Sequence, residues 1–167
     1  MPMWMSSSIS HAIAAFGARL LRVRWFVRTP IWLYRARLGG LFGARLLMLE
    51  HTGRQSGARR YVVLEVVAHP TPDTYVVVSG FGNRAQWFRN VRVTPGVRVT
   101  IGSHRPVPAT ARLLDCERAT EALDAFRIQH PQAWAHFKPI LENTLGTPLD
   151  APDAELPVIA LQLTPNA

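Results

Sequence analysis

Two glycines and three arginines share one short stretch of this chain, "HTGRQSGARR" (51–60). Gly53 and Gly57 allow a turn whose backbone N–H groups converge, and guanidinium groups donate in a fork that suits phosphate or carboxylate. The arginines are Arg54, Arg59 and Arg60. The stretch is not a Walker P-loop, because three residues separate the glycines and Ala58 stands where that motif has Lys. The pattern predicts an anion site that is not built for ATP. A solvent-exposed basic hairpin turn is the alternative.

A second stretch, "SGFGNRAQWFRN" (79–90), combines small residues with a tryptophan. Ser79 and Gly80 follow a run of valines, so they stand at the end of a predicted strand, where small residues let a flat ring approach the backbone. Trp87 and Asn90 are three residues apart and therefore share one face of a predicted helix. The pattern predicts a site for a planar ligand. Core packing of Trp87 and a capping role for Asn90 are the alternatives.

The other residues with reactive side chains do not form a recognisable site. The six histidines include no pair with metal-ligand spacing and no H-E-x-x-H motif, so we expect no metal. The single cysteine, Cys116, cannot form an internal disulfide, which favours a reducing compartment. We therefore expect a cytoplasmic protein.

Positive charge is concentrated in the first third of the chain. Residues 1–60 carry ten arginines against one acid, a net +9, which leaves −1 for residues 61–167 of the total +8. Such a region can attract nucleic acid, anionic lipid or an acidic small molecule. No helix-turn-helix, zinc or RRM signature accompanies the charge, so we expect no nucleic-acid partner.

The N-terminal region has the periodicity of a helix from about residue 8 to residue 27. Its apolar positions, at spacings of four, three and four, are Ile9, Ile13, Phe16 and Leu20. The helix either packs on its own domain or lies at the inner face of the cell membrane as a peripheral contact. Arg19 interrupts the apolar run, so neither a secretory signal nor a spanning helix is expected. We predict a basic helical extension over 1–40 and a cofactor-binding domain over 41–167.

The remainder of the chain alternates short apolar runs with single helices, and its 167 residues suit one ordinary domain. The predicted strands are 45–52, 61–67, 74–80, 97–101, 106–114 and 156–163. The predicted helices are 83–95, 116–129 after the cap Asp115, and 131–145 from Pro131. Because the strands show no βαβ regularity, we predict an α+β fold, a small antiparallel barrel with helices outside it.

The two stretches together, "TGRQSGARR" and "YVVVSGFGN…QWFRNVRVTPGVRVTIG", resemble the deazaflavin-dependent nitroreductase/quinone reductase family over residues 46–114. The resemblance implies a split β-barrel of the FMN-binding type. It also implies coenzyme F-420, a deazaflavin with a phosphate and an acidic oligoglutamate tail that donates hydride. FMN is the alternative cofactor, and a homodimer is left open.

The resemblance assigns residues to the cofactor by position. For the phosphate and tail they are Arg54, Gln55, Ser56 and Arg60. Val78, Ser79 and Gly80 would line the ring, with Trp87 and Asn90 on its far side. The chain departs from the family pattern at Gln55, where Lys is usual, and Arg59 beside Arg60 would compensate for the lost charge. Phe81-Gly82 and Ala85-Gln86 replace the usual Gly-Gly and Pro before the tryptophan.

The implied chemistry is hydride transfer to a small-molecule acceptor: a quinone, an activated alkene or a nitro compound. This reaction needs close positioning of donor and acceptor and little else from the protein. Ser79 or Tyr61 could donate a hydrogen bond to a developing oxyanion, or be purely structural. An FMN-using reductase and a non-catalytic carrier of deazaflavin or an apolar ligand are the alternative functions.

Overall fold

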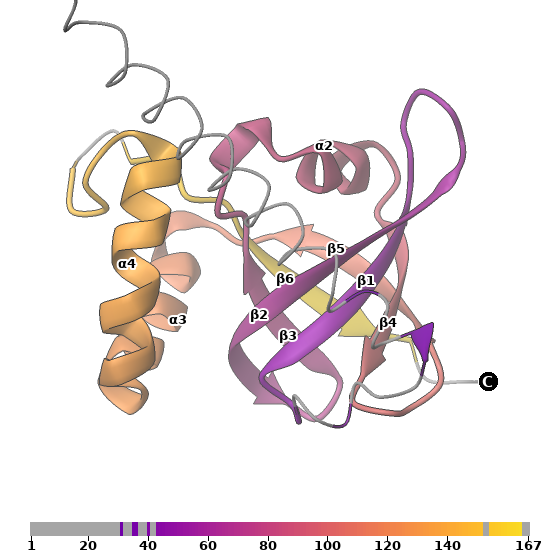
Figure 1. Cartoon of the computed structure of the whole chain (residues 1–167), viewed down its shortest axis with the longest axis horizontal. Helices are drawn as coiled ribbons and strands as arrows, with labels where there is room; N and C mark the ends of the chain where they lie inside the picture. Colours follow the sequence, from indigo (N-terminus) through magenta and orange to yellow (C-terminus); the bar gives the residue numbers. More distant parts are fainter. Residues whose placement is uncertain (1–30, 32–34, 37–39, 41–42, 152–153, 165–167) are drawn as a thin grey trace, which may run out of the picture.

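The structure, a computed structural model, describes residues 31, 35–36, 40, 43–151 and 154–164. Within them, six strands close into a barrel in the order β1-β2-β3-β6-β5-β4, and every neighbouring pair is antiparallel (Figure 1). The strands are β1 (Leu46–Thr52), β2 (Arg59–Thr71), β3 (Thr74–Val78), β4 (Gly96–Ile101), β5 (Val107–Leu113) and β6 (Val158–Leu163). The predicted α+β fold with a small antiparallel barrel is confirmed.

The helices begin and end close to the predicted positions. They are α3 (Cys116–Gln129) and α4 (Pro131–Leu145), with a 3-10 turn η2 (Gly82–Arg84) and α2 (Gln86–Val93) in place of one helix over 83–95. The side chain of Asp115 accepts a hydrogen bond from the backbone N–H of Arg118 at 2.9 Å, as an N-cap does. Proline at the first position of α4 has no N–H to leave unpaired.

The predicted N-terminal amphipathic helix lies largely outside the described residues. The division into 1–40 and 41–167 and the peripheral membrane contact therefore stay predictions. Among the residues that the structure does describe, no helix has the length and apolar character needed to cross a bilayer.

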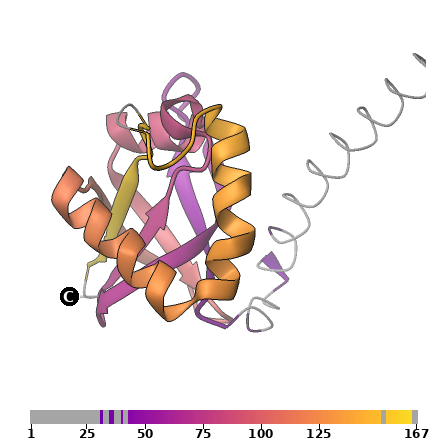
Figure 2. The ribbon, with the colours of Figure 1, turned by 90° about the vertical axis from the view of Figure 1, so that its left-hand side faces the viewer.

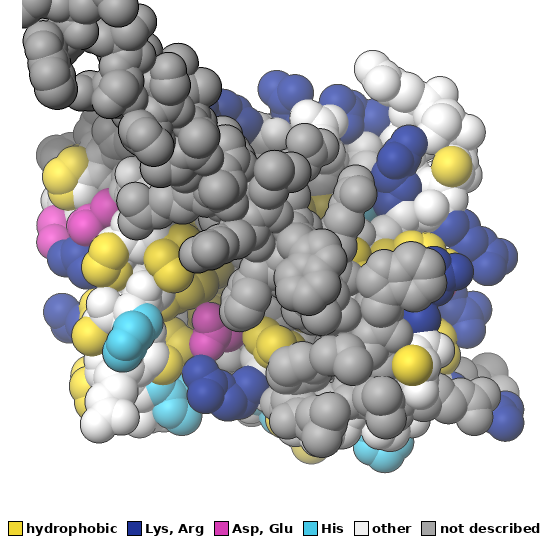
Figure 3. Space-filling model, in the orientation of Figure 1, with side chains coloured by type: hydrophobic (Ala, Val, Ile, Leu, Met, Phe, Trp, Pro, Cys, Tyr) yellow, Lys and Arg dark blue, Asp and Glu magenta, His cyan; other side chains and the backbone are white. Residues whose placement is uncertain are grey.

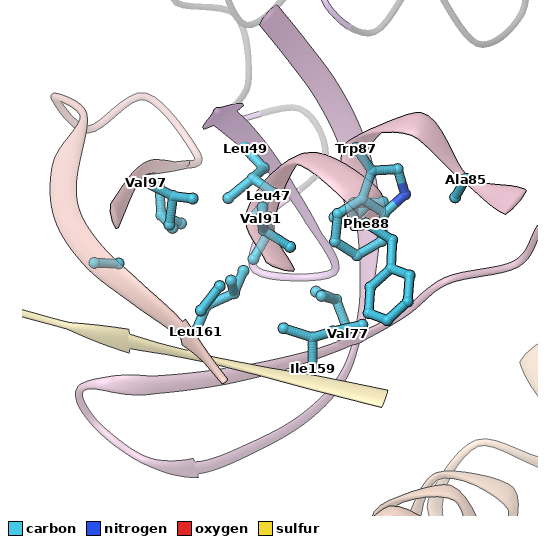
Figure 4. Close-up of a cluster of buried hydrophobic side chains, with 14 residues drawn as sticks. Leu47, Leu49, Val77, Ala85, Trp87, Phe88, Val91, Val97, Ile159 and Leu161 are labelled. Atoms are coloured by element: carbon cyan, nitrogen blue, oxygen red, sulfur yellow. The ribbon is translucent and has the colours of Figure 1, made fainter. Parts of the chain in front are cut away.

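The barrel interior is filled by alternate residues of its strands, as the two-residue period of a strand requires. Figure 4 shows Leu47 and Leu49 of β1 with Val77 and Leu161 from other strands, and Trp87 and Phe88 of α2 beside them. In Figure 1, α2 lies across one end of the barrel. The apolar face of α2 therefore closes that end, next to the β1–β2 hairpin turn.

A second apolar cluster joins the outside of the barrel to the two long helices. Val78 of β3 packs there with Phe126 of α3 and Leu141 of α4. In Figure 2, α3 and α4 meet at the bottom and diverge upward in front of the barrel. The strand that precedes Ser79 is thus enclosed on both of its faces, by the barrel interior and by the helices.

Candidate functional site

The β1–β2 hairpin turn is held by its own hydrogen bonds. The N–H of Gly53 donates to the carbonyl of Ala58 at 2.8 Å, and that of Gly57 donates to the carbonyl of Gly53 at 2.7 Å. Gly57 has φ +66°, a left-handed conformation that favours glycine. These two N–H groups therefore do not converge on a ligand as the sequence had suggested. The side chains of the turn are therefore the main candidates to hold an anion there.

Arg54 is fixed to α2 by two side chains of that helix. Its backbone N–H donates to Asn90 Oδ1 at 3.1 Å, and its Nη1 donates to the same oxygen at 3.0 Å. Nη1 also donates to Gln86 Oε1 at 3.0 Å. The turn and the helix are thereby joined, and the guanidinium group of Arg54 has a defined direction. Sequence reasoning singled out Arg54 and Asn90 separately but did not pair them.

Arg59 and Arg60 lie on opposite faces of β2, because neighbouring strand residues point to opposite sides. Arg60 is opposite His51 in the β1–β2 register, and its Nε lies 3.2 Å from the place where a Cβ of Gly53 would stand. Arg59 faces the other way and pairs with Glu50, with Nε 3.7 Å from Oε1. Arg60 therefore lies against the turn, whereas Arg59 is directed away from it.

His51 is a member of this group that sequence reasoning missed. It is 5% exposed, and its Nδ1 lies 3.2 Å from Nδ2 of the equally buried Asn90. Burial, and then the positive charge of Arg60, lower the pKa of His51 from 6.5 to about 4. The imidazole is neutral at neutral pH. Its position in the same alternating row as Leu47 and Leu49 was the available signal that it faces inward.

The residues expected to line a ring are enclosed by protein. Ser79 is fully buried, its hydroxyl donates to the carbonyl of Gly82 at 2.7 Å, and its N–H donates to Pro157 at 2.9 Å. A Cβ on Gly80 would lie 3.3 Å from Leu141 of α4. In this conformation Ser79 and Gly80 support the loop from inside, together with the buried Val78.

The two candidate hydrogen-bond donors for chemistry do not converge. Ser79 continues the inward-facing row of Val77, whereas Tyr61 lies opposite Glu50 on the outer side of the barrel wall. The guanidinium carbon of Arg35 lies 5.5 Å from the centre of the Tyr61 ring. The geometry therefore assigns no proton donor. Trp87 is in the barrel core, with its ring edge-on to Phe88.

The outer surface of the turn and α2 is basic. Dark-blue side chains follow the upper edge of Figure 3, where α2 and the hairpin lie in Figure 1. Four arginines of the turn, η2 and α2 are partly or fully exposed, and we call them the basic face: Arg54, Arg60, Arg84 and Arg89. In the described parts of the chain, no carboxylate lies within ion-pairing distance of any of them. The donor set suits an anion with several negative groups.

Two cavities lie away from the basic face. One, of about 630 Å³, is lined by the beginning of α4 with Arg45 and Glu65. The other, of about 820 Å³, lies between α3 and the barrel wall. None of the residues predicted to bind the cofactor lines either cavity. The described residues also contain no cluster of potential metal ligands.

Comparison with known proteins identifies the family. The model of the F420H2-dependent quinone reductase family matches residues 25–139. Among solved structures, an F420-H2 dependent reductase (FDR-A) is 24% identical, with 71% of this chain and 94% of that chain covered and a TM-score of 0.50. A second, described as a domain-swapped dimer, is 23% identical, with 87% and 99% covered and a TM-score of 0.54.

A third structure, of a protein of unknown function from Agrobacterium tumefaciens, is 15% identical, with 81% of this chain and 55% of that chain covered and a TM-score of 0.52. At such identities these structures show the barrel fold alone. No curated protein matches the chain. The family match extends over more than half of the sequence, and the basic face suits an acidic cofactor. The chain belongs to the F420H2-dependent quinone reductase family, and it is an oxidoreductase that uses coenzyme F-420.

Proposed function

We propose that this reductase holds the phosphate and acidic tail of F-420 against the basic face and passes its hydride to a quinone. The observation that carries the proposal is the fixed guanidinium of Arg54. It is anchored to Asn90 and Gln86, and Arg60 lies against the same turn. No carboxylate of the described residues pairs with Arg54.

An arginine that is already oriented binds an anion with a smaller loss of side-chain entropy than a free one. A charge-assisted hydrogen bond contributes roughly 1.5–3 kcal/mol. Two such arginines at one turn can therefore account for a large part of the affinity for the anionic end of the coenzyme. Gln55 and Ser56, at the exposed tip of the turn, would complete this contact.

Bound F-420 supplies the hydride, so the protein has to bind and orient its two ligands. The family description favours a quinone as acceptor, and activated alkenes and nitro compounds are the alternatives. Val78, Ser79 and Gly80 would shape the ring site indirectly, by supporting the backbone of the loop that follows β3. No side chain is assigned as a proton donor.

The test is a fluorescence titration of F-420 with wild-type protein and with Arg54→Ala and Arg60→Ala. Each substitution should weaken binding by about tenfold or more, and higher ionic strength should weaken wild-type binding. Arg118→Ala is the matched control, because it removes an arginine from α3, where Arg118 pairs with Asp115. Unchanged affinity in both basic-face variants would contradict the site. Tight FMN binding with no response to F-420 would instead indicate an FMN-using protein.

Two further assignments stay proposals. The similar structure described as a domain-swapped dimer supports a homodimer for this chain, which sedimentation velocity can test. Peripheral contact of residues 1–40 with anionic membranes is supported only by the arginine-rich sequence of that region. Co-sedimentation with anionic and with neutral vesicles at low salt would distinguish it from packing on the barrel.

A further inference from the structure

We propose that His51 is a positioning residue of the cofactor site, which acts through Asn90 to fix the direction of the Arg54 guanidinium group. The inference rests on the proposed role of Arg54 in binding the anionic end of F-420. It concerns a residue to which the resemblance assigned no role, and one that does not itself contact the ligand.

The three side chains form a continuous chain of hydrogen bonds from the barrel interior to its surface. His51 Nδ1 lies 3.2 Å from Asn90 Nδ2, and Asn90 Oδ1 accepts from the Arg54 backbone N–H at 3.1 Å and from Nη1 at 3.0 Å. His51 and Asn90 are both buried, at 5% and 3% exposure. Arg54, at the outer end, is partly exposed. The chain thus connects β1, α2 and the turn.

The donors of Arg54 determine the orientation of the Asn90 amide. Both donate to the same atom, so that atom is the amide oxygen, and the amide nitrogen must face His51. The nitrogen of an amide can only donate, so Nδ1 of His51 must be its acceptor. His51 therefore carries its proton on Nε2 and is neutral. The lowered pKa of His51, caused first by burial, agrees with this assignment.

This hydrogen bond explains why a histidine stands in an apolar row. Leu47 and Leu49 precede it at the inward-facing positions of β1, and an aliphatic residue at position 51 would continue their pattern. It would also leave the buried amide nitrogen of Asn90 without an acceptor, which costs free energy. In the described residues, every buried polar side-chain atom has a partner. The hydrogen bond with Asn90 therefore explains why His51 stands among the inward-facing leucines of β1.

Loss of the acceptor should affect Arg54 and not only the core. Without His51 Nδ1, nothing on the inner side holds the amide nitrogen of Asn90. The amide can then rotate, and its oxygen can turn away from the Arg54 guanidinium group. Arg54 would then keep its charge but lose part of its orientation. The expected effect is selective for the anionic end of the coenzyme.

The experiment compares His51→Leu, which removes the acceptor, with His51→Asn, whose side-chain oxygen can take the place of Nδ1. Binding of F-420 and of the deazaflavin chromophore without phosphate and tail is followed by fluorescence. His51→Leu should bind F-420 about threefold to tenfold more weakly and bind the phosphate-free chromophore as wild type does. His51→Asn should bind F-420 within about twofold of the wild-type affinity. In an Arg54→Ala background, His51→Leu should have no further effect on F-420.

The outcomes separate this inference from the proposed function. If Arg54→Ala weakens F-420 binding and His51→Leu does not, the positioning role is overturned while the site stands. Equal loss of both ligands in His51→Leu would also overturn it, because that result indicates a general packing effect. If Arg54→Ala has no effect, the proposed site itself fails. Should His51→Leu not fold, His51→Gln, whose amide lies beyond the Nδ1 position, is the replacement and should give the same selective loss.

Discussion

Acidification should destabilise the folded protein through His51. Its pKa is about 4 in the folded state, against 6.5 for a free side chain. Between these values the unfolded chain binds a proton that the folded chain does not, so the free energy of unfolding falls as the pH falls. The contribution of His51 to the free energy of unfolding is complete above about pH 6.5 and is lost progressively down to about pH 4.

The magnitude follows from the difference between the two pKa values. Each pKa unit corresponds to about 1.4 kcal/mol, so the whole window is worth about 3 kcal/mol, and about 2 kcal/mol is lost between about pH 7 and pH 5. The physical cause is the buried imidazole: protonation would place a donor against Asn90 Nδ2 and a positive charge near Arg60. An unfolding free energy of ordinary size makes such a loss easy to measure.

The assay is urea unfolding at several pH values, with His51→Asn as the reference. This variant keeps an acceptor for Asn90 but has no titratable group, and the difference between it and wild type removes the contributions of all other groups. The difference should grow by about 2 kcal/mol as the pH falls from about 7 to about 5. Parallel pH profiles for the two proteins would refute the reasoning.

Other groups with shifted pKa values affect stability outside the pH range in which His51 titrates. Hydrogen bonds from Thr71 first, and from Thr74, lower the pKa of Asp73, and Lys138 lowers that of Asp150. A carboxylate with a lowered pKa loses its stabilising effect only as the pH falls below about 3.8. The pKa of Lys138 is raised, so its contribution is lost only above about pH 10.5.

Three substitutions test the packing that supports the site, each by chemical denaturation. Leu141→Ala should cost about 2–5 kcal/mol, because Leu141 is 1% exposed between α4 and the barrel; a loss under about 1 kcal/mol would mean that α4 packs only loosely. Gly82→Ala should cost about 1–2 kcal/mol, since φ is +57° and the new Cβ would lie 2.9 Å from Leu145; unchanged stability would show that the loop relaxes. Asp115→Ala should cost about 1 kcal/mol by removing the α3 cap, and Asp115→Asn should recover most of it; equal stability of the two variants would contradict the capping role.

Local signals in the sequence were sufficient for the elements of the barrel. The β-branched runs predicted six strands, and Asp115 and Pro131 predicted where two helices begin. These signals are local because strand propensity, N-capping and the fixed φ of proline act over a few residues. The paired motifs likewise identified the family and its cofactor, which the family match confirms.

Only the tertiary structure decided which side chains act together. A composition of three arginines cannot show which of Arg59 and Arg60 faces His51, because that depends on the register of the hairpin. The same holds for Ser79. Its small size at a strand end made it a ligand-facing candidate, but it is fully buried and bonded to the carbonyl groups of Gly82 and Pro157. His51 and Asn90 are 39 positions apart, and they meet because α2 closes the end of the barrel where β1 ends. Propensity fixes each element separately, whereas such contacts arise only when the elements pack.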